Sequence, residues 1–193
     1  METWLLAGLL GLGLGLAAAT GLKTFLSLLM LSAAARFELF GIELSGAFAW
    51  LKSDAALIAL TVAAIAEFLA DKIPVVDHAL SAFGTVARPA AGALAAAAAF
   101  SGLDPAMAAV LGLIVGAPTA LAFNTAQAGT RLTSTATTGG LANPAVSFAE
   151  DVLAFLTAAL ALAAPLLIPI LLALMLFAAW SLFRRLVRRS RAA

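Results

Sequence analysis

The chain has 193 residues, of which 64% are apolar and 11% are charged, with a mean hydropathy of +1.10 and a net charge of +1. A soluble domain of this length carries about a quarter of its residues as Asp, Glu, Lys and Arg, which cover its surface. This composition excludes an ordinary soluble globule and predicts an integral membrane protein with the lipid bilayer as its partner. The sequence contains no cysteine, which excludes disulfides, thiolate metal sites and a cysteine nucleophile.

The beginning of the chain predicts one full span and one short one. Residues 4–19 form an apolar run whose glycines suit close helix packing. No basic segment precedes this run, so we expect a retained membrane helix and not a signal peptide. The run 25–35 is too short to cross a hydrocarbon core of about 30 Å. It predicts a half-helix or re-entrant segment with Lys23 at its start, followed by an interfacial connection over 36–54.

The middle of the chain alternates apolar runs with prolines. Residues 55–72 predict the next span. The segment 74–89 predicts a turn and a short amphipathic piece, because the proline at its start does not continue the preceding helix. The alanine-rich run 90–100 spans only if its helix begins near Leu80 with Pro89 as a kink.

The second half predicts three more spans, over 106–123, 145–163 and 166–183. Between the first two lies the polar segment 124–144, rich in Thr and Gly. It predicts either an exposed loop or backbone folded into the protein at membrane depth. Five arginines in the tail 184–193 predict a cytoplasmic anchor.

A weak internal repeat relates the two halves, about 1–101 and 102–183. Each reads as a glycine-rich helix, an acid-bearing helix and a proline-containing helix. Three spans per half would give the halves opposite orientations. The sequence therefore predicts an all-α, polytopic transmembrane bundle of about six spans. It is a single domain over 1–193, made of two inverted repeats with broken or re-entrant segments, and both termini are cytoplasmic. A full crossing by 25–35 would make seven spans and place the N-terminus outside.

Glu67 and Asp71 are the first candidate functional residues. They lie one helical turn apart and share a helix face. Charge within a bilayer costs a few kcal/mol, so such groups face the protein interior or water and usually mark a pathway. Glu67 is the deeper of the two and favours a functional role. Asp71, with Lys72 beside it, fits equally well at the wet end of a span.

A second acidic pair, Glu150 and Asp151, follows the segment "ANPAVSFA". We expect this helix to begin at Pro144 with Asn143 as its N-cap. Acids near a helix start also gain from the helix dipole, so a structural role stays open. Ser147 adds a hydroxyl one turn earlier, and Glu150 is the better functional candidate of the pair.

Two cations, Lys23 and Arg131, follow "ATGL" and "QAGT" in the two halves. They can pair with the acids, for example Arg131 with Glu150 or Glu67, or receive an anionic substrate beside half-helix N-termini. We favour pairing, because it requires no external partner.

Two further polar residues complete the candidates. Arg88, before a proline, is expected to snorkel to the interface. Asn124, with Gln127 in the same Thr-rich segment, either lines a polar path or belongs to a flexible loop.

Other chemistries have little support. The sequence has no nucleotide-binding loop, Ser-His-Asp set or histidine-rich metal motif. Four carboxylates could bind a hard cation, but without a spacing motif no metal is assigned. We expect no cofactor and no nucleic-acid partner.

Four segments occur in order along the chain: "AEFLADKIPVVDH", "RPAAGAL", "AGTR" and "NPAVSFAEDVLA". Over nearly its whole length the chain thereby resembles a bacterial membrane family described only as a domain of unknown function, number 4126. The resemblance implies no substrate, but it implies that the positions matching the family pattern matter together. The matching positions are Glu67, Asp71, Lys72, Pro74, Arg88, Gly92, Gly129, Arg131, Asn143, Pro144, Glu150 and Asp151.

The sequence thus predicts a small transporter or channel for an ion or small solute in the inner membrane. Proton coupling is an option, because a buried carboxylate with a raised pKa exchanges protons near neutral pH. Six spans leave little room for a vestibule, which is compatible with a homodimer. The alternatives are an intramembrane enzyme acting on lipid and a non-catalytic scaffold, and we favour a protein that is not an enzyme.

Overall fold

The structure is a computed structural model that describes residues 2–72 and 74–190. These residues form helices and no strand, which confirms the all-α prediction. Residues 191–193 of the predicted basic tail lie outside the described part. In chain order the elements are α1 (Glu2–Leu22), α2 (Thr24–Arg36), η1 (Leu39–Gly41), η2 (Gly46–Lys52), α3 (Asp54–Ala70), α4 (Pro74–Ala99), α5 (Pro105–Leu111), η3 (Gly112–Gly116), α6 (Ala117–Thr138), α7 (Asn143–Ala163), η4 (Pro165–Leu167) and α8 (Ile168–Ser190).

Three helical stretches are long and apolar enough to cross a membrane: Thr3–Leu22, Pro105–Thr138 and Asn143–Ala163. A fourth is added if η2 and α3, which meet at a 65° bend, count as one broken span. These lengths and compositions indicate a membrane protein. Within the described part of the chain they do not amount to the six spans that the sequence suggested.

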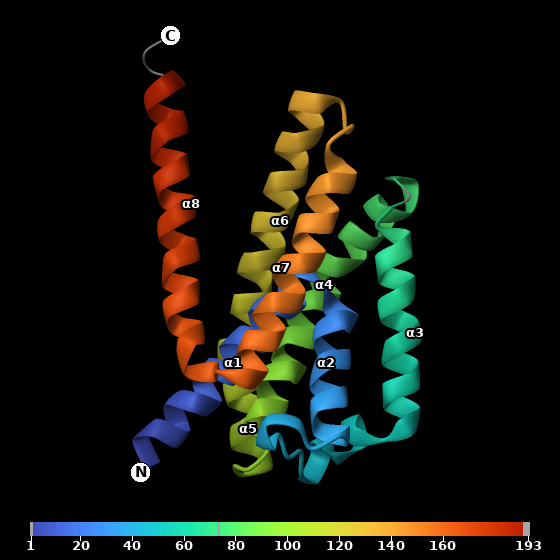
Figure 1. Ribbon diagram of the computed structural model, residues 1–193, viewed down its shortest axis with the longest axis vertical. Coiled ribbons are helices and arrows are strands. Elements are labelled where there is room, and N and C mark those ends of the chain that lie inside the picture. Colours follow the sequence, from blue (N-terminus) through green and yellow to red (C-terminus); the bar gives the residue numbers. More distant parts are fainter. Residues whose placement is uncertain (1, 73, 191–193) are drawn as a thin grey trace.

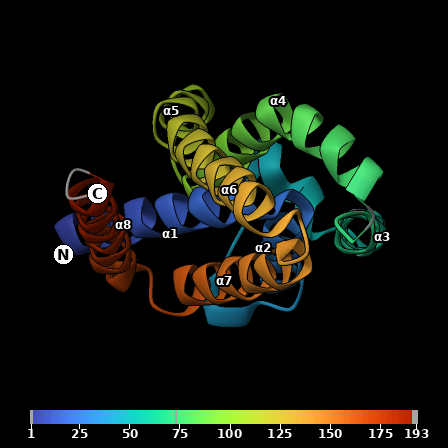
Figure 2. The same cartoon turned by 90° about the horizontal axis from the view of Figure 1, so that it is seen from above.

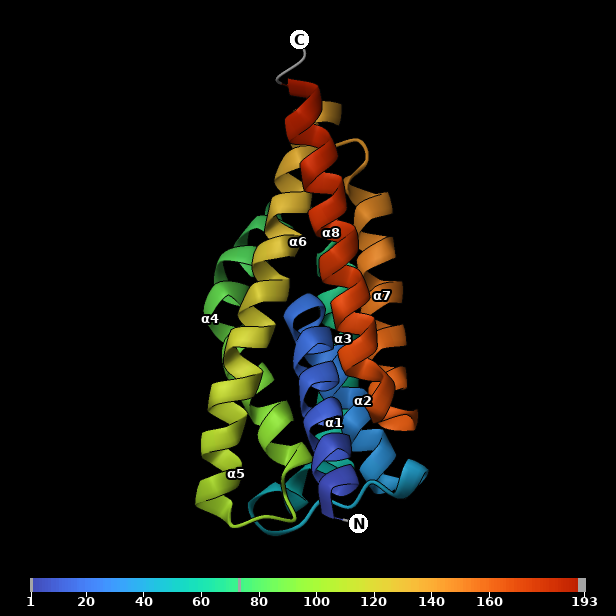
Figure 3. The same cartoon turned by 90° about the vertical axis from the view of Figure 1, so that its left-hand side faces the viewer.

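α1 and α2 form a hairpin whose turn is the single residue Lys23 (Figure 1). α1 rises from the N-terminal end to the centre of the molecule, and α2 returns toward that end (Figures 1 and 3). Lys23 has an extended backbone, with φ −140° and ψ 108°, which separates the two helices. α2 has 13 residues and is therefore about 20 Å long. The predicted half-helix is present, and its start lies inside the molecule.

The remaining helices alternate in direction along the long axis (Figures 1 and 3). The beginning of α1 and the end of α8 therefore lie at opposite ends of the molecule. This arrangement differs from the six-span prediction, which placed both chain ends together, because the returning α2 adds one reversal. For the same reason the glycine-rich α1 and α5–α6 run in the same direction. Among the helices that the repeat would relate, only two pairs run in opposite directions, as an inverted repeat requires. They are α3 with α7 and α4 with α8.

Glycines let α1 pack closely against α6 (Figure 2) and let η3 pack closely against α4. A Cβ atom at Gly21 would lie 2.4 Å from the carbonyl oxygen of Ala120. A Cβ at Gly116, in the π-helical turn η3, would lie 2.3 Å from the carbonyl oxygen of Gly92. Neither position has room for a side chain, and such contacts are typical of small-residue helix packing in membranes. The close packing places the hairpin tip among α3, α4, α6 and α7.

The polar segment 124–144 is neither a loop nor irregular backbone, as the sequence had suggested, because α6 continues through most of it. The hydroxyls of Thr125, Thr130 and Thr133 each donate to the carbonyl oxygen four residues earlier. Threonine polarity is thus satisfied within the helix itself, so it does not end the helix.

Two other helix starts differ from the predictions. α4 begins at Pro74 and not near Leu80, because a proline is well accommodated in the first turn of a helix. α7 begins at Asn143, and its N-cap position is occupied by Ala142. The Asn143 amide instead donates to Thr135 Oγ1 at 3.0 Å. The prediction that Asn143 caps this helix is therefore wrong.

Candidate functional site

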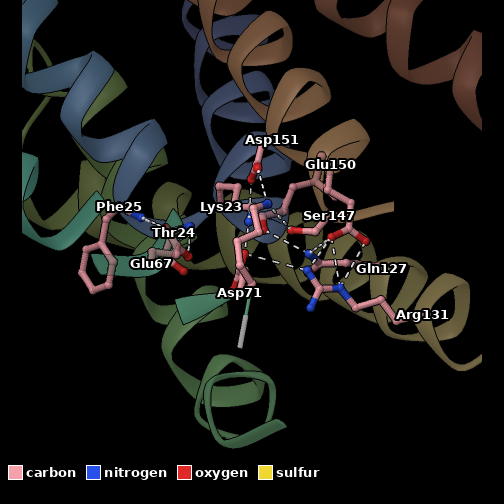
Figure 4. A network of polar contacts seen from close by, with 12 residues as sticks. Lys23, Thr24, Phe25, Glu67, Asp71, Gln127, Arg131, Ser147, Glu150 and Asp151 are labelled. Carbon is pink, nitrogen blue, oxygen red and sulfur yellow. Dashed lines mark hydrogen bonds and ion pairs between the residues drawn. The ribbon is translucent and has the colours of Figure 1, made fainter. Parts of the chain in front are cut away.

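Eight ionisable side chains gather around the tip of the α1–α2 hairpin. Figure 4 labels Lys23, Glu67, Asp71, Arg131, Glu150 and Asp151 among them. Of the eight, four are acids and four are cations, so their formal charges cancel. Neutrality of this kind makes buried charge tolerable, because an unpaired ion in a low-dielectric interior costs several kcal/mol. We call this set the charged cluster: Lys23, Glu67, Asp71, Lys72, Arg88, Arg131, Glu150 and Asp151.

Lys23 is the centre of the charged cluster, and its side chain is only 2% exposed. Its ammonium pairs with Asp71 and lies 2.6 Å from Asp151 Oδ1. The other oxygen of Asp151 lies 3.1 Å from Lys72 Nζ. Asp71 is buried as well, which contradicts the reading that it belongs to a wet helix end. The hairpin turn is thus held by two carboxylates from two different helices.

Glu67 binds the start of α2. Its two carboxylate oxygens accept hydrogen bonds from the backbone N–H groups of Thr24 and Phe25, both at 2.9 Å. These N–H groups begin α2 and have no partner within the helix. The negative charge also lies at the positive end of the helix dipole. Glu67 is therefore buried and stabilised mainly by backbone.

Arg88 binds the end of α1, on the other side of the same break. Its Nη1 donates to the carbonyl oxygen of Gly21 at 3.3 Å, to Asn124 Oδ1 at 2.8 Å and to Gln127 Oε1. The side chain is buried, so the prediction that it snorkels to the interface is wrong. The free carbonyl of a broken helix and two amides give it interior partners instead. Opposite charges from α3 and α4 thus complement the two helix ends at the break.

Arg131 and Glu150 form the third part of the cluster. Arg131 Nη2 lies 2.7 Å from Glu150 Oε2, and its Nε lies 3.1 Å from the same oxygen. Arg131 also approaches Asp71 Oδ2 at 3.8 Å, which links this pair to Lys23. One of the pairings suggested by the sequence is therefore present. Arg131 nevertheless lies inside α6 and not at a helix break, so its proposed equivalence to Lys23 is wrong.

Gln127 joins Arg88 to Glu150. Its oxygen accepts from Arg88, and its Nε2 donates to Glu150 Oε2 at 2.7 Å. The sequence had offered Gln127 only as an amide that could line a polar path, beside Asn124, and had given it no ionic partner. The spacing of Asn124, Gln127 and Arg131 along one helix face was the signal that could have identified it.

The remaining candidates separate into two groups. Ser147 accepts a hydrogen bond from Lys72 Nζ at 2.9 Å, and the Lys72 ammonium lies 4.6 Å from the Phe68 ring centre. Ser147 and Asn124 thus contact the cluster, whereas Asn143 contacts Thr135 farther along α6.

The two acidic pairs enter the cluster differently. Glu67 lies in the last turn of α3, while Glu150 is the eighth residue of α7. Their positions along the helices are not equivalent. They reach one region because the two helices run in opposite directions (Figure 1).

A cavity of about 290 Å³ adjoins the cluster between α2, α3 and α4. Glu67, Asp71 and Arg88 contribute to its wall, together with Phe25 and Phe83. Among the described side chains, no group of three His, Cys, Asp or Glu residues is arranged to hold a metal ion. The site can exchange ion pairs and hydrogen bonds beside a partly open space.

Comparison with known proteins identifies a family over residues 10–185, which include the hairpin tip and all eight members of the charged cluster. No curated protein and no solved structure matches the chain. The resemblance drawn from four sequence segments is thereby confirmed at the level of the family. This chain belongs to the family described as "Domain of unknown function (DUF4126)".

Proposed function

We propose that this protein transports a small ion or solute across the membrane, with protons coupled through the charged cluster. The observation that carries the proposal is the break at Lys23, where two helix ends and buried carboxylates meet beside a cavity. Membrane transporters commonly build their sites from broken helices in this way. Ionisable groups within a membrane protein are costly and usually mark a pathway.

The pairing in the cluster supports this function because it is redundant. Lys23 faces both Asp71 and Asp151, and Asp151 also faces Lys72. Protonation of Asp71 or of Asp151 therefore leaves Lys23 paired with the other carboxylate. When Asp151 is protonated, Lys72 keeps its contact with the Ser147 hydroxyl. A cluster of this kind can change its pairing at modest cost, whereas an isolated buried pair cannot.

Flux through proteoliposomes tests the proposal. We expect the wild-type protein to carry one member of a broad ion and solute panel, and a pH gradient to drive that flux. Glu67→Gln and Glu150→Gln should each lower it at least about tenfold, equivalent to 1.4 kcal/mol in the barrier. Glu43→Gln, in the exposed connection at the other end, is the matched control and should leave it unchanged.

The alternatives give different results in the same samples. Turnover of the vesicle lipids without flux would favour an intramembrane enzyme. Folded variants indistinguishable from wild type, with no flux in any sample, would favour a scaffold whose charges only set helix register.

We place the protein in the plasma (inner) membrane, and charge asymmetry supports an orientation with the C-terminus in the cytoplasm. The end of α8 carries arginines, whereas the connections near the start of α1 are mostly acidic. The sequence has no cysteine, so a single introduced cysteine can be labelled by a thiol reagent without competition from other thiols of the chain. In intact cells a membrane-impermeant maleimide should label Ala47→Cys and spare Leu141→Cys, both exposed positions. The reverse pattern would invert the orientation.

We further propose a homodimer, because α8 stands apart from α6 (Figure 2). An apolar groove of about 420 Å³ lies between them, with Phe123 on one side and Met175 on the other. A second copy would bury this surface. Light scattering of the detergent complex measures the protein mass, and a strict monomer would contradict the assembly.

A further inference from the structure

We propose that the cavity between α2, α3 and α4 binds a small zwitterion with a short apolar part, the chemistry of an amino acid or a betaine. This inference rests on the proposed transport function and specifies its cargo. It starts from the two signs of charge that meet on one cavity wall. Glu67 and Asp71 come from α3, and Arg88 comes from α4.

The rest of the wall suits a short apolar group. Phe25 and Phe83 contribute rings, and the other lining positions on α3 and α4 are small. They are Ala63, Ala66, Ala70, Gly84 and Ala87. A volume of about 290 Å³ lies at the lower end of the roughly 300–1,000 Å³ typical of ligand pockets. An amino acid with an aliphatic side chain fits this volume.

The balance of acids and cations in the charged cluster favours a ligand with no net charge. The charged cluster holds four acids and four cations, so a bound ion would add an uncompensated charge to a buried site. A zwitterion adds none. Its ammonium can face the α3 carboxylates while its carboxylate faces the Arg88 guanidinium, so both charged ends find opposite charges.

The existing contacts allow this exchange. Asp71 can turn toward a ligand ammonium while Lys23 keeps Asp151, which lies 2.6 Å away. Arg88 donates to the neutral amides of Asn124 and Gln127, and a ligand carboxylate is a stronger acceptor than either. The ligand therefore replaces contacts without leaving a buried ion unpaired.

Equilibrium binding to the purified full-length protein tests the charge selection. The zwitterionic probes are glycine betaine, valine and leucine. Isoamylamine and isocaproate are leucine without its carboxylate and without its amine. We expect at least one zwitterion to bind about tenfold or more tightly than either ion, a difference of about 1.4 kcal/mol. Tighter binding of the amine or of the acid overturns the inference, as does failure of all three zwitterions to bind.

A cavity-filling variant locates the site. A Cβ at Gly84 would lie 3.2 Å from Arg88 Nε, so Gly84→Leu should fill the cavity and weaken zwitterion binding more than tenfold. Gly8→Leu is the matched control, because a Cβ at Gly8 meets nothing within 4 Å. Unchanged binding by a folded Gly84→Leu protein overturns the location. The probe comparison uses wild-type protein and does not depend on the folding of either variant.

The inference and the transport proposal can fail separately. Zwitterion binding without flux in sealed proteoliposomes upholds this inference and overturns transport. Flux of another solute, with no zwitterion bound, overturns this inference and leaves transport intact.

Discussion

Two charged cavities lie at different levels of the molecule, and they differ in what their charges do. The larger, of about 690 Å³, is lined by the connection after α2 and includes Arg36, Glu43 and Lys52. The nearby pair of Arg36 and Asp54 is 44% and 74% exposed. At the smaller cavity, by contrast, the side chains of Lys23 and Asp71 are each 2% exposed.

The comparison shows that burial, and not cavity volume, gives a charge its energetic weight. Ion pairs in water contribute little, because the surrounding dielectric screens them and two flexible side chains must be ordered. Buried charges are strongly destabilising when a partner is removed. We therefore expect substitutions at the hairpin tip to lower the free energy of unfolding far more than equivalent ones in the connection.

Lys23→Met should have the largest effect. It leaves Asp71 and Asp151 facing each other without the central cation, which should lower the free energy of unfolding by about 3–5 kcal/mol. Thermal unfolding of the detergent-solubilised protein measures this, with Lys52→Met as the exposed control. Adding Asp71→Asn to Lys23→Met should recover part of the loss, because Asp151 keeps Lys72. If Lys23→Met unfolds at the wild-type midpoint, the buried charges contribute no more to stability than the exposed ones.

Glu67→Gln should come next. The amide keeps only one acceptor for the two N–H groups at the start of α2 and loses the charge that favours the helix dipole. We expect a loss of about 1–3 kcal/mol in the free energy of unfolding. Faster hydrogen exchange of the Thr24 and Phe25 amides should accompany it. Unchanged exchange at these two amides would mean that Glu67 does not hold the α2 start.

Arg131→Lys should be milder. An ammonium keeps the charge but cannot contact Glu150 through two nitrogens as the guanidinium does. A loss of about 1 kcal/mol in the free energy of unfolding is expected. A loss as large as that of Lys23→Met would show that Arg131 contributes as much to stability as Lys23 does.

Asp54→Asn should have the smallest effect. It removes the exposed pair with Arg36, whose Nε lies 2.8 Å from Asp54 Oδ1. We expect no measurable change in the unfolding midpoint at low or high salt, because solvent already screens this pair. A clearly lower unfolding midpoint would show that the exposed ion pair in the connection also stabilises the protein.

The sequence predicted the membrane class, the short second helix and the acidic residues of the cluster, because these depend on local composition and helical spacing. Lys23 next to a short apolar run was enough to predict a broken helix. Arg88 was misread because its partners, Gly21 and Gln127, are distant in sequence. Glu67 was identified as buried, but its backbone partners follow only from how the hairpin packs on α3.

Segment 124–144 was misread for a different reason. Threonine side chains predict a loop when their hydroxyls compete with the backbone, yet here they bond to the preceding turn of α6. Only the packing of α6 against its neighbours decides between these outcomes. The directions of the helices likewise depended on whether α2 returns or crosses, which length alone left open.

The hairpin tip also sets an order of events during synthesis. Lys23 leaves the ribosome 48 residues before Asp71, its first carboxylate partner, and longer still before Asp151. At about 5–20 residues per second, the ammonium has neither partner for several seconds. The hairpin can therefore take its place only after α3 has followed it into the bilayer, and its second ion pair must wait for α7. The ion pairs of the hairpin tip therefore form late, although Lys23 is the first residue of the charged cluster to be made.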